Sequence, residues 1–222
     1  MKKLIIPILM LLFFAGTSFA QLKLNAEVNG GMASPQGDLG DFYKTGYNFN
    51  AAVFYGISDN FDVSLSVGYL RFGFDNDKLN NSIHEIDPTA PTFSGDAYLS
   101  SVPVMVGVKY YLITGMVKPY LTADLGMHFL TVTSPSGNYV VGSDQTITAS
   151  SASESKSGFG IGAGILFSIT PSLSVDVAAK YNTISFEAKQ ENTTVSGNTT
   201  TTTSSSSTAS YFTIMAGLNF PL

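Results

Sequence analysis

The chain has 222 residues, of which 44% are hydrophobic, only 12% are charged and none is cysteine. Its 16 acidic and 11 basic residues give a net charge of −5, which excludes the basic footprint of a nucleic-acid-binding protein. An ordinary soluble domain carries about 25% charged residues. The low charge, with 21 glycines, 16 phenylalanines and 11 tyrosines, favours strands that face lipid.

The amino terminus has the parts of an export signal. Lys2 and Lys3 precede an apolar run over residues 4–14, and small residues at Ser18 and Ala20 fit a cleavage site. The run is too short to cross about 30 Å of hydrocarbon as a helix. We therefore expect a signal peptide over residues 1–20 and a single mature domain over residues 21–222.

The rest of the chain contains eight stretches in which apolar and polar residues alternate. In the stretch from Phe61 to Phe72, for example, Val63, Leu65 and Val67 alternate with Asp62, Ser64 and Ser66. Each stretch has roughly the 9–11 residues that a tilted strand needs to cross a bilayer. The expected strands are 22–33, 47–57, 61–72, 98–112, 119–132, 158–169, 173–186 and 211–220.

The connections between these strands alternate in length. Short turns are expected at 58–60, 113–118 and 170–172, and long loops at 34–46, 74–97, 133–157 and 187–210. This alternation is typical of outer-membrane barrels. The sequence therefore predicts an all-β fold, an eight-stranded antiparallel up-and-down transmembrane β-barrel with short periplasmic turns and long extracellular loops.

A soluble lipocalin-type barrel is the alternative, in which the apolar face would point inward. Two features favour the membrane. The polar face carries many small Gly and Ser residues, which would coat a soluble surface poorly, and the long loops carry much of the charge. Aromatic residues also lie near both strand ends, with Tyr55 and Tyr110 toward the turns and Tyr69 and Phe129 toward the loops, as in interfacial girdles.

Four segments carry a family resemblance: Ser34–Leu39, Val67–Phe72, Val102–Tyr111 and Lys118–Leu121. On these segments the chain resembles the eight-stranded outer-membrane β-barrel domain family of the OmpA/OmpX-like type. The resemblance implies architecture rather than activity, and we expect no peptidoglycan-binding domain of the kind that follows the eighth strand in larger relatives. It also implies recognition by the barrel-assembly machinery through a terminal aromatic residue, here Phe220, although Pro221 and Leu222 follow it.

Pro103 lies within an expected strand although it cannot donate a ladder hydrogen bond. A closed barrel has no free edge on which such a residue is easily placed. We therefore expect a bulge or a local widening of the wall at Pro103.

The polar faces of the strands define an expected interior set. An eight-stranded barrel is only wide enough for its own side chains, and charges without water must be paired. We therefore expect an ion-pair and hydrogen-bond plug that closes the lumen, with a gated ion path as the alternative. The charged and histidine members are Lys23, Glu27, Asp62, Lys109, Asp124, His128, Asp176 and Lys180, accompanied by Ser64, Ser66, Tyr120, Thr122 and Ser174.

Three other motifs point to chemistry only weakly. Gly158–Ala163 fits a dinucleotide-binding pattern but continues with glycine at every second position, which indicates a strand with a bare inner face. The Asp75–Asp77 segment starts like a calcium loop, yet Leu79 stands where a ligand belongs. His84 and His128 show no recognisable catalytic arrangement. We expect no catalytic, cofactor or metal site.

Two segments, 133–157 and 192–210, are rich in serine and threonine. They lack the apolar surface that would offset the entropy of ordering the chain, so mobile outer loop tips are expected. Such loops either bind a partner outside the cell or vary without constraint, and the sequence leaves both open.

The function expected from these observations is non-enzymatic. The protein would be a monomeric structural or surface-interaction protein of the bacterial outer membrane, surrounded by outer-membrane lipids, with a plugged lumen and exposed polar loops. A narrow porin-like channel or small-ligand transport protein is the alternative, and an enzyme that modifies outer-leaflet lipid is a third reading.

Overall fold

The computed structural model describes residues 23–89, 97–133, 137–140, 144–147, 151–188, 194–196, 199–201 and 205–222. The expected signal peptide at residues 1–20 lies outside these ranges, as do large parts of the two Ser/Thr-rich segments. Among the described residues, no helix is both long and apolar enough to span a membrane.

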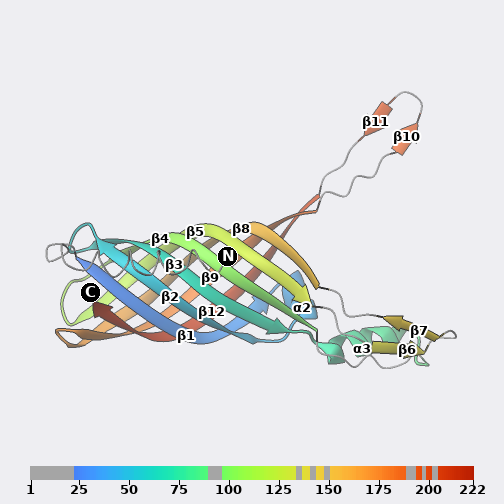
Figure 1. The fold of residues 1–222 in the computed structure, drawn as a ribbon, viewed down its shortest axis with the longest axis horizontal. Helices are drawn as coiled ribbons and strands as arrows, with labels where there is room; N and C mark the ends of the chain where they lie inside the picture. Colours follow the sequence, from blue (N-terminus) through green and yellow to red (C-terminus); the bar gives the residue numbers. More distant parts are fainter. Residues whose placement is uncertain are drawn as a thin grey trace, which may run out of the picture.

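Eight antiparallel strands close into one barrel (Figure 1). Each strand pairs with its neighbour along the barrel chain, and the first pairs with the last, so the predicted up-and-down topology is confirmed. The strands are β1 (Leu24–Gln36), β2 (Gly46–Gly56), β3 (Phe61–Gly73), β4 (Tyr98–Tyr111), β5 (Val117–Thr133), β8 (Ser151–Thr170), β9 (Leu173–Ala188) and β12 (Ser205–Pro221).

The two faces of the wall differ as the alternation predicts. On β3, Leu65 and Val67 are exposed at the outer surface, whereas Asp62 and Ser64 are buried inside. The same alternation continues on β4, where Val106 is exposed and Lys109 is buried. A belt of apolar side chains thus surrounds a polar interior, as a barrel in lipid requires.

The long connections carry additional elements at one end of the barrel, opposite the short turns (Figure 1). The sequence reading expected only loops there, because most of these elements have too few residues to show a period and residues 76–86 are mostly polar. The elements are α2 (Asp38–Phe42), α3 (Asn76–Ile86), and the two hairpins β6 (Gly137–Val140) with β7 (Asp144–Ile147) and β10 (Thr194–Ser196) with β11 (Thr199–Thr201).

Two strands begin six or more residues earlier than the sequence predicts. β8 begins at Ser151 rather than 158, and β12 begins at Ser205 rather than 211. The added residues are mostly serine, so they are polar on both faces and show no alternation. Their backbone still pairs, since the ladder between β5 and β8 runs to the pair Thr133 and Ser151.

Pro103 lies at a gap in the pairing of β3 with β4, and the bulge that was one of the two expectations is absent there. The β3–β4 ladder pairs Val67 with Val104 and then resumes at Leu70 with Ser101, in the same register. Pro103 faces Gly68, where an added Cβ would lie 3.0 Å from the proline ring. The missing amide donor is therefore accommodated by a gap in the ladder and not by a bulge.

Candidate functional site

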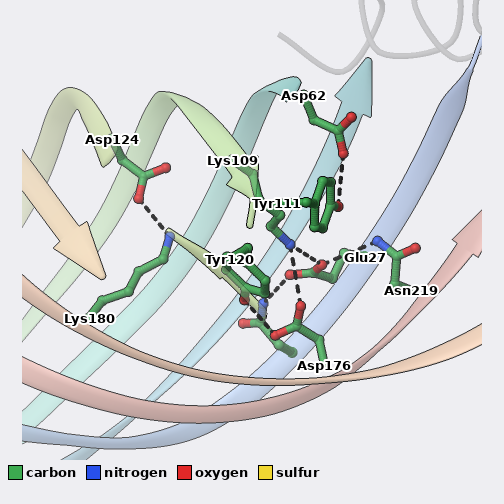
Figure 2. Close-up of polar contacts among 10 residues, drawn as sticks. Glu27, Asp62, Lys109, Tyr111, Tyr120, Asp124, Asp176, Lys180 and Asn219 are labelled. Carbon is green, nitrogen blue, oxygen red and sulfur yellow. Dashed lines mark hydrogen bonds and ion pairs between the residues drawn. The ribbon is translucent and has the colours of Figure 1, made fainter. Parts of the chain in front are cut away.

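A buried lysine on β4 makes the central polar contact of the barrel interior (Figure 2). Lys109 Nζ lies 2.9 Å from Glu27 Oε2 of β1 and 3.3 Å from Asp176 Oδ2 of β9. All three side chains are at most 5% exposed. These strands are not neighbours in the barrel wall, so the ion pairs bridge the lumen.

Uncharged donors complete the contacts of the two carboxylates. The Tyr120 hydroxyl donates to Asp176 Oδ1 at 2.7 Å, and the Asn219 side-chain amide donates to Glu27 Oε2 at 3.2 Å. Buried charges require such pairing, since desolvation is otherwise unfavourable by several kcal/mol. We call Glu27, Lys109, Tyr120, Asp176 and Asn219 the polar layer.

Two further polar pairs flank this layer. The Tyr111 hydroxyl donates to Asp62 Oδ2 at 2.9 Å, and Lys180 Nζ donates to Asp124 Oδ2 at 2.6 Å (Figure 2). A small cavity of about 20 Å³, lined by Lys109 and Lys180 among others, separates the polar layer from the second pair. Polar contacts therefore follow one another along the lumen.

Lys23 does not join these contacts. Its side chain is 63% exposed and its Nζ lies 2.7 Å from Asp59 Oδ1, in the turn between β2 and β3. Alternation alone assigns Lys23 to the inner face, but the residue precedes β1 and lies where the lumen opens. The Lys23 ammonium lowers the pKa of Asp59 through a direct hydrogen bond.

His128 is buried deeper toward the loops and contacts a serine. Its Nδ1 lies 3.2 Å from the Ser101 hydroxyl oxygen, and its ring meets the Tyr211 ring edge-on at 6.2 Å. The other histidine, His84, lies on α3, where Nδ1 contacts the Asn80 carbonyl oxygen at 2.7 Å. The two histidines thus belong to separate parts of the molecule, one in the lumen and one in an outer connection.

Glycines on the inner face of β8 make room for the polar side chains. An added Cβ at Gly158 would collide with the His128 ring, and one at Gly164 would collide with the Tyr120 ring. The segment that matched a nucleotide-binding pattern is therefore a strand whose bare face accommodates side chains from other strands.

Apolar side chains close the lumen near the loops. They form one buried cluster, which we call the apolar layer and to which α2 contributes a single residue; the members are Ala33, Leu39, Leu70, Phe72, Leu99, Leu130, Ile184 and Tyr211. The sequence reading missed this layer because it searched the inner face only for polar residues. The available signal was a loss of alternation, since β3 ends with apolar residues on both faces at Tyr69, Leu70 and Phe72.

The spaces along the lumen are unequal. A cavity of about 50 Å³, lined in part by Asp124, His128 and Tyr211, lies between the Lys180 pair and the apolar layer. A pocket of about 700 Å³ opens at the turn end, and its lining includes Asp62 and Tyr111. The lumen is therefore open from the turns as far as the Asp62–Tyr111 pair and narrow beyond it.

Acidic residues at the start of α3 contact a lysine. Lys44 Nζ lies 2.8 Å from Asp77 Oδ2 and 3.5 Å from Asp75 Oδ1. Across the part of the chain that the structure describes, no three His, Cys, Asp or Glu side chains form a group suited to a metal ion.

The family comparison extends over most of the chain. A family model described as outer membrane protein beta-barrel domain matches residues 6–220. No curated protein sequence matches the chain.

Solved outer-membrane barrels have similar folds at low sequence identity. Neisserial surface protein A is 19% identical, with a TM-score of 0.51 over 90% of this chain and 97% of its own. A major outer membrane protein from Thermus thermophilus is 14% identical, with a TM-score of 0.52 over 91% and 100%. The outer membrane protease OmpT from Escherichia coli is 10% identical, with a TM-score of 0.43 over 93% and 100%.

Proposed function

The chain belongs to the outer membrane protein β-barrel domain family and lies in the bacterial outer membrane, and from this premise we propose that it is a non-enzymatic, closed anchor that presents its outer connections to the surroundings. In this proposal the barrel supplies attachment to the membrane. The long connections supply the surface that meets partners outside the cell.

The observation that carries the proposal is the double closure of the lumen. The polar layer crosses the barrel near the turns, where Lys109 contacts carboxylates from two distant strands. The apolar layer crosses it again near the loops, where Phe72 and Ile184 are almost fully buried. A hydrated ion would have to separate paired charges and then pass through apolar side chains, which is unfavourable at both steps.

Planar-bilayer recording tests the closure. The purified full-length mature chain, refolded and shown to be closed by its heat-dependent gel shift, should give no current steps at moderate voltage. A water-filled porin in the same bilayer serves as the positive control. Stable, repeated steps from the wild-type chain would contradict the closed anchor and make transport the function.

A channel function can also be tested by ion selectivity. If current passed through the lumen, Lys180→Gln and Asp124→Asn should change its ion selectivity in opposite directions, because the two side chains carry opposite charges. Their combination keeps the net charge of the wild-type interior, so it is the matched control for the two single variants.

A lipid-modification assay tests the enzymatic alternative. The wild-type chain, incubated with phospholipid and phosphorylated glycolipid in vesicles, should leave both unchanged in mass. Product formation that His128→Ala or His84→Ala abolishes, while the gel shift persists, would contradict a non-enzymatic function.

A further inference from the structure

The chain has one arginine in 222 residues, and it lies on the outer surface of the barrel. Arg71 is on β3, two residues before the strand ends at Gly73. It has the same facing as Leu65, Val67 and Tyr69, whose side chains are exposed on the lipid side. No lysine of the eight described barrel strands has this outward facing, because their alternation places Lys109, Lys118, Lys156 and Lys180 on the inner face.

The position of Arg71 along the strand corresponds to the outer headgroup level. Ten residues separate it from Phe61, which begins β3 beside the short turn. At about 3.4 Å per residue and a tilt of about 40°, ten residues rise roughly 25 Å, the height of the apolar band of such a barrel. An arginine at this level lies beside the lipid headgroups and not within the hydrocarbon.

Aromatic side chains fix the guanidinium of Arg71. Its Cζ lies 3.8 Å from the centroid of the Tyr98 ring on β4. Tyr47 of β2 is directly opposite Arg71 in the ladder, and its ring lies 6.2 Å from that of Tyr69. Stacking on the Tyr98 ring covers one face of the guanidinium and leaves the N–H donors at its edge free to point outward. This arrangement suits a bidentate contact with an anion.

Among the residues that the structure describes, no carboxylate forms an ion pair with Arg71. Five of the described lysines lie within 4 Å of a carboxylate, whereas no described carboxylate pairs with Arg71; the five are Lys23, Lys44, Lys109, Lys156 and Lys180. The acids that follow it in the chain, Asp75 and Asp77, both contact Lys44. A fixed guanidinium without a carboxylate is the arrangement that binds an external phosphate through paired hydrogen bonds.

We propose that Arg71, held by Tyr98 and flanked by Tyr47, binds a phosphate group in the headgroup of an outer-leaflet lipid. The site attaches the loop end of the β2–β3–β4 wall to the lipid around it. This proposal concerns the outside of the barrel and does not depend on whether the lumen conducts.

Titration in phosphate-free micelles tests the site. The full-length mature chain is kept in a sugar-headgroup detergent and titrated calorimetrically with a glycolipid carrying two phosphates (lipid A), and separately with the same lipid after removal of both phosphates. We expect Arg71→Gln to weaken binding of the phosphorylated lipid by about tenfold or more, the equivalent of one charge-assisted hydrogen bond. The dephosphorylated lipid should bind wild type and variant equally.

Three controls make the outcome decisive. Arg71→Lys keeps the charge but loses the planar fork, so it should weaken binding less than Arg71→Gln. Lys118→Gln removes a cation at the opposite end of the barrel wall, and it should change nothing; its ammonium lies over the Tyr111 ring with 5.7 Å to the centroid. Inorganic phosphate should bind far more weakly than the lipid.

Several results would overturn the proposal. Equal lipid affinities of wild type and Arg71→Gln would show that Arg71 does not bind the lipid. Equal losses in Arg71→Gln and Lys118→Gln would indicate general electrostatic attraction, and tight binding of inorganic phosphate would exclude a lipid as the specific source. Arg71 lies on the outer surface and Lys118 lines the pocket at the turn end, and retention of the heat-dependent gel shift in each variant confirms that the barrel is intact.

Discussion

The lumen is closed at two levels by different means. Near the turns, the polar layer is built from charges whose partners come from several strands, such as Lys109 with Glu27 and Asp176. Near the loops, the apolar layer is built from side chains such as Phe72 and Leu130 that only have to fill space. The polar layer depends on the pairing of every buried charge, whereas the apolar layer depends on side-chain volume. The same kind of substitution therefore affects the two layers differently.

The largest expected effect follows from removing the lysine of the polar layer. Lys109→Met keeps the length of the side chain but leaves Glu27 and Asp176 buried without their cation. Breaking a buried pair in this way destabilises a protein by about 3–5 kcal/mol. Urea titration in lipid vesicles, followed by the heat-dependent gel shift, measures the loss.

A compensated variant separates lost pairing from lost packing. Combining Lys109→Met with Glu27→Gln and Asp176→Asn removes all three charges, and most of the lost stability should return. If the triple variant is as unstable as Lys109→Met alone, unpaired charge is not the cause and the description of the polar layer is wrong.

A smaller loss is expected in the apolar layer. Leu70 is 2% exposed inside the lumen, and Leu70→Ala should destabilise the barrel by about 2–5 kcal/mol, toward the lower part of this range if neighbours close the cavity. The measurement is the same urea titration. Leu65→Ala on the lipid side of β3 is the matched control, since Leu65 is 60% exposed and lipid chains fill the space left behind.

These two leucines test how much the apolar layer contributes to stability. A larger loss for Leu70→Ala than for Leu65→Ala would show that packing inside the lumen stabilises the barrel. Equal losses would mean that the apolar layer contributes no more than ordinary contact with lipid.

The smallest effect is expected at Lys23. Because its pair with Asp59 is largely exposed to solvent, Lys23→Gln should leave the urea midpoint at pH 7 within experimental error of the wild type. The pKa of Asp59 is lowered in the folded chain, so any stabilisation is present above the ordinary pKa of aspartate and is lost as the pH falls through the lowered pKa. Wild type and variant should therefore converge in acid; a large loss at pH 7 would place Lys23 among the buried charges after all.

The strands could be predicted from the sequence because apolar and polar residues alternate along each strand that crosses the membrane. The stretch from Phe61 to Phe72 showed this alternation, and the structure has β3 from Phe61 to Gly73. The outward facing of Val106 and the inward facing of Lys109 followed from the same period. Burial against lipid imposes this pattern on every strand, so the local sequence contains the information.

Other features depend on contacts that a local pattern does not contain. Alternation assigned Lys23 an inner position but could not show that the residue precedes β1 and lies beyond the closed part of the lumen. It could not show that Leu39 of α2 packs among strand residues 31 or more positions away, such as Leu70 and Leu99. The partners of Lys109 come from β1 and β9, and only the closed topology brings them together.

Nearly all of the apolar layer belongs to the barrel strands, with Leu39 as the member contributed by an outer connection. In the closed anchor that we propose, the barrier to small solutes is therefore largely separate from the outer connections. Loop sequences can change, lengthen or be exchanged for foreign peptides without opening a route into the periplasm, provided that the position of Leu39 keeps an apolar side chain. The same separation makes the barrel a suitable carrier for displaying peptides on the cell surface.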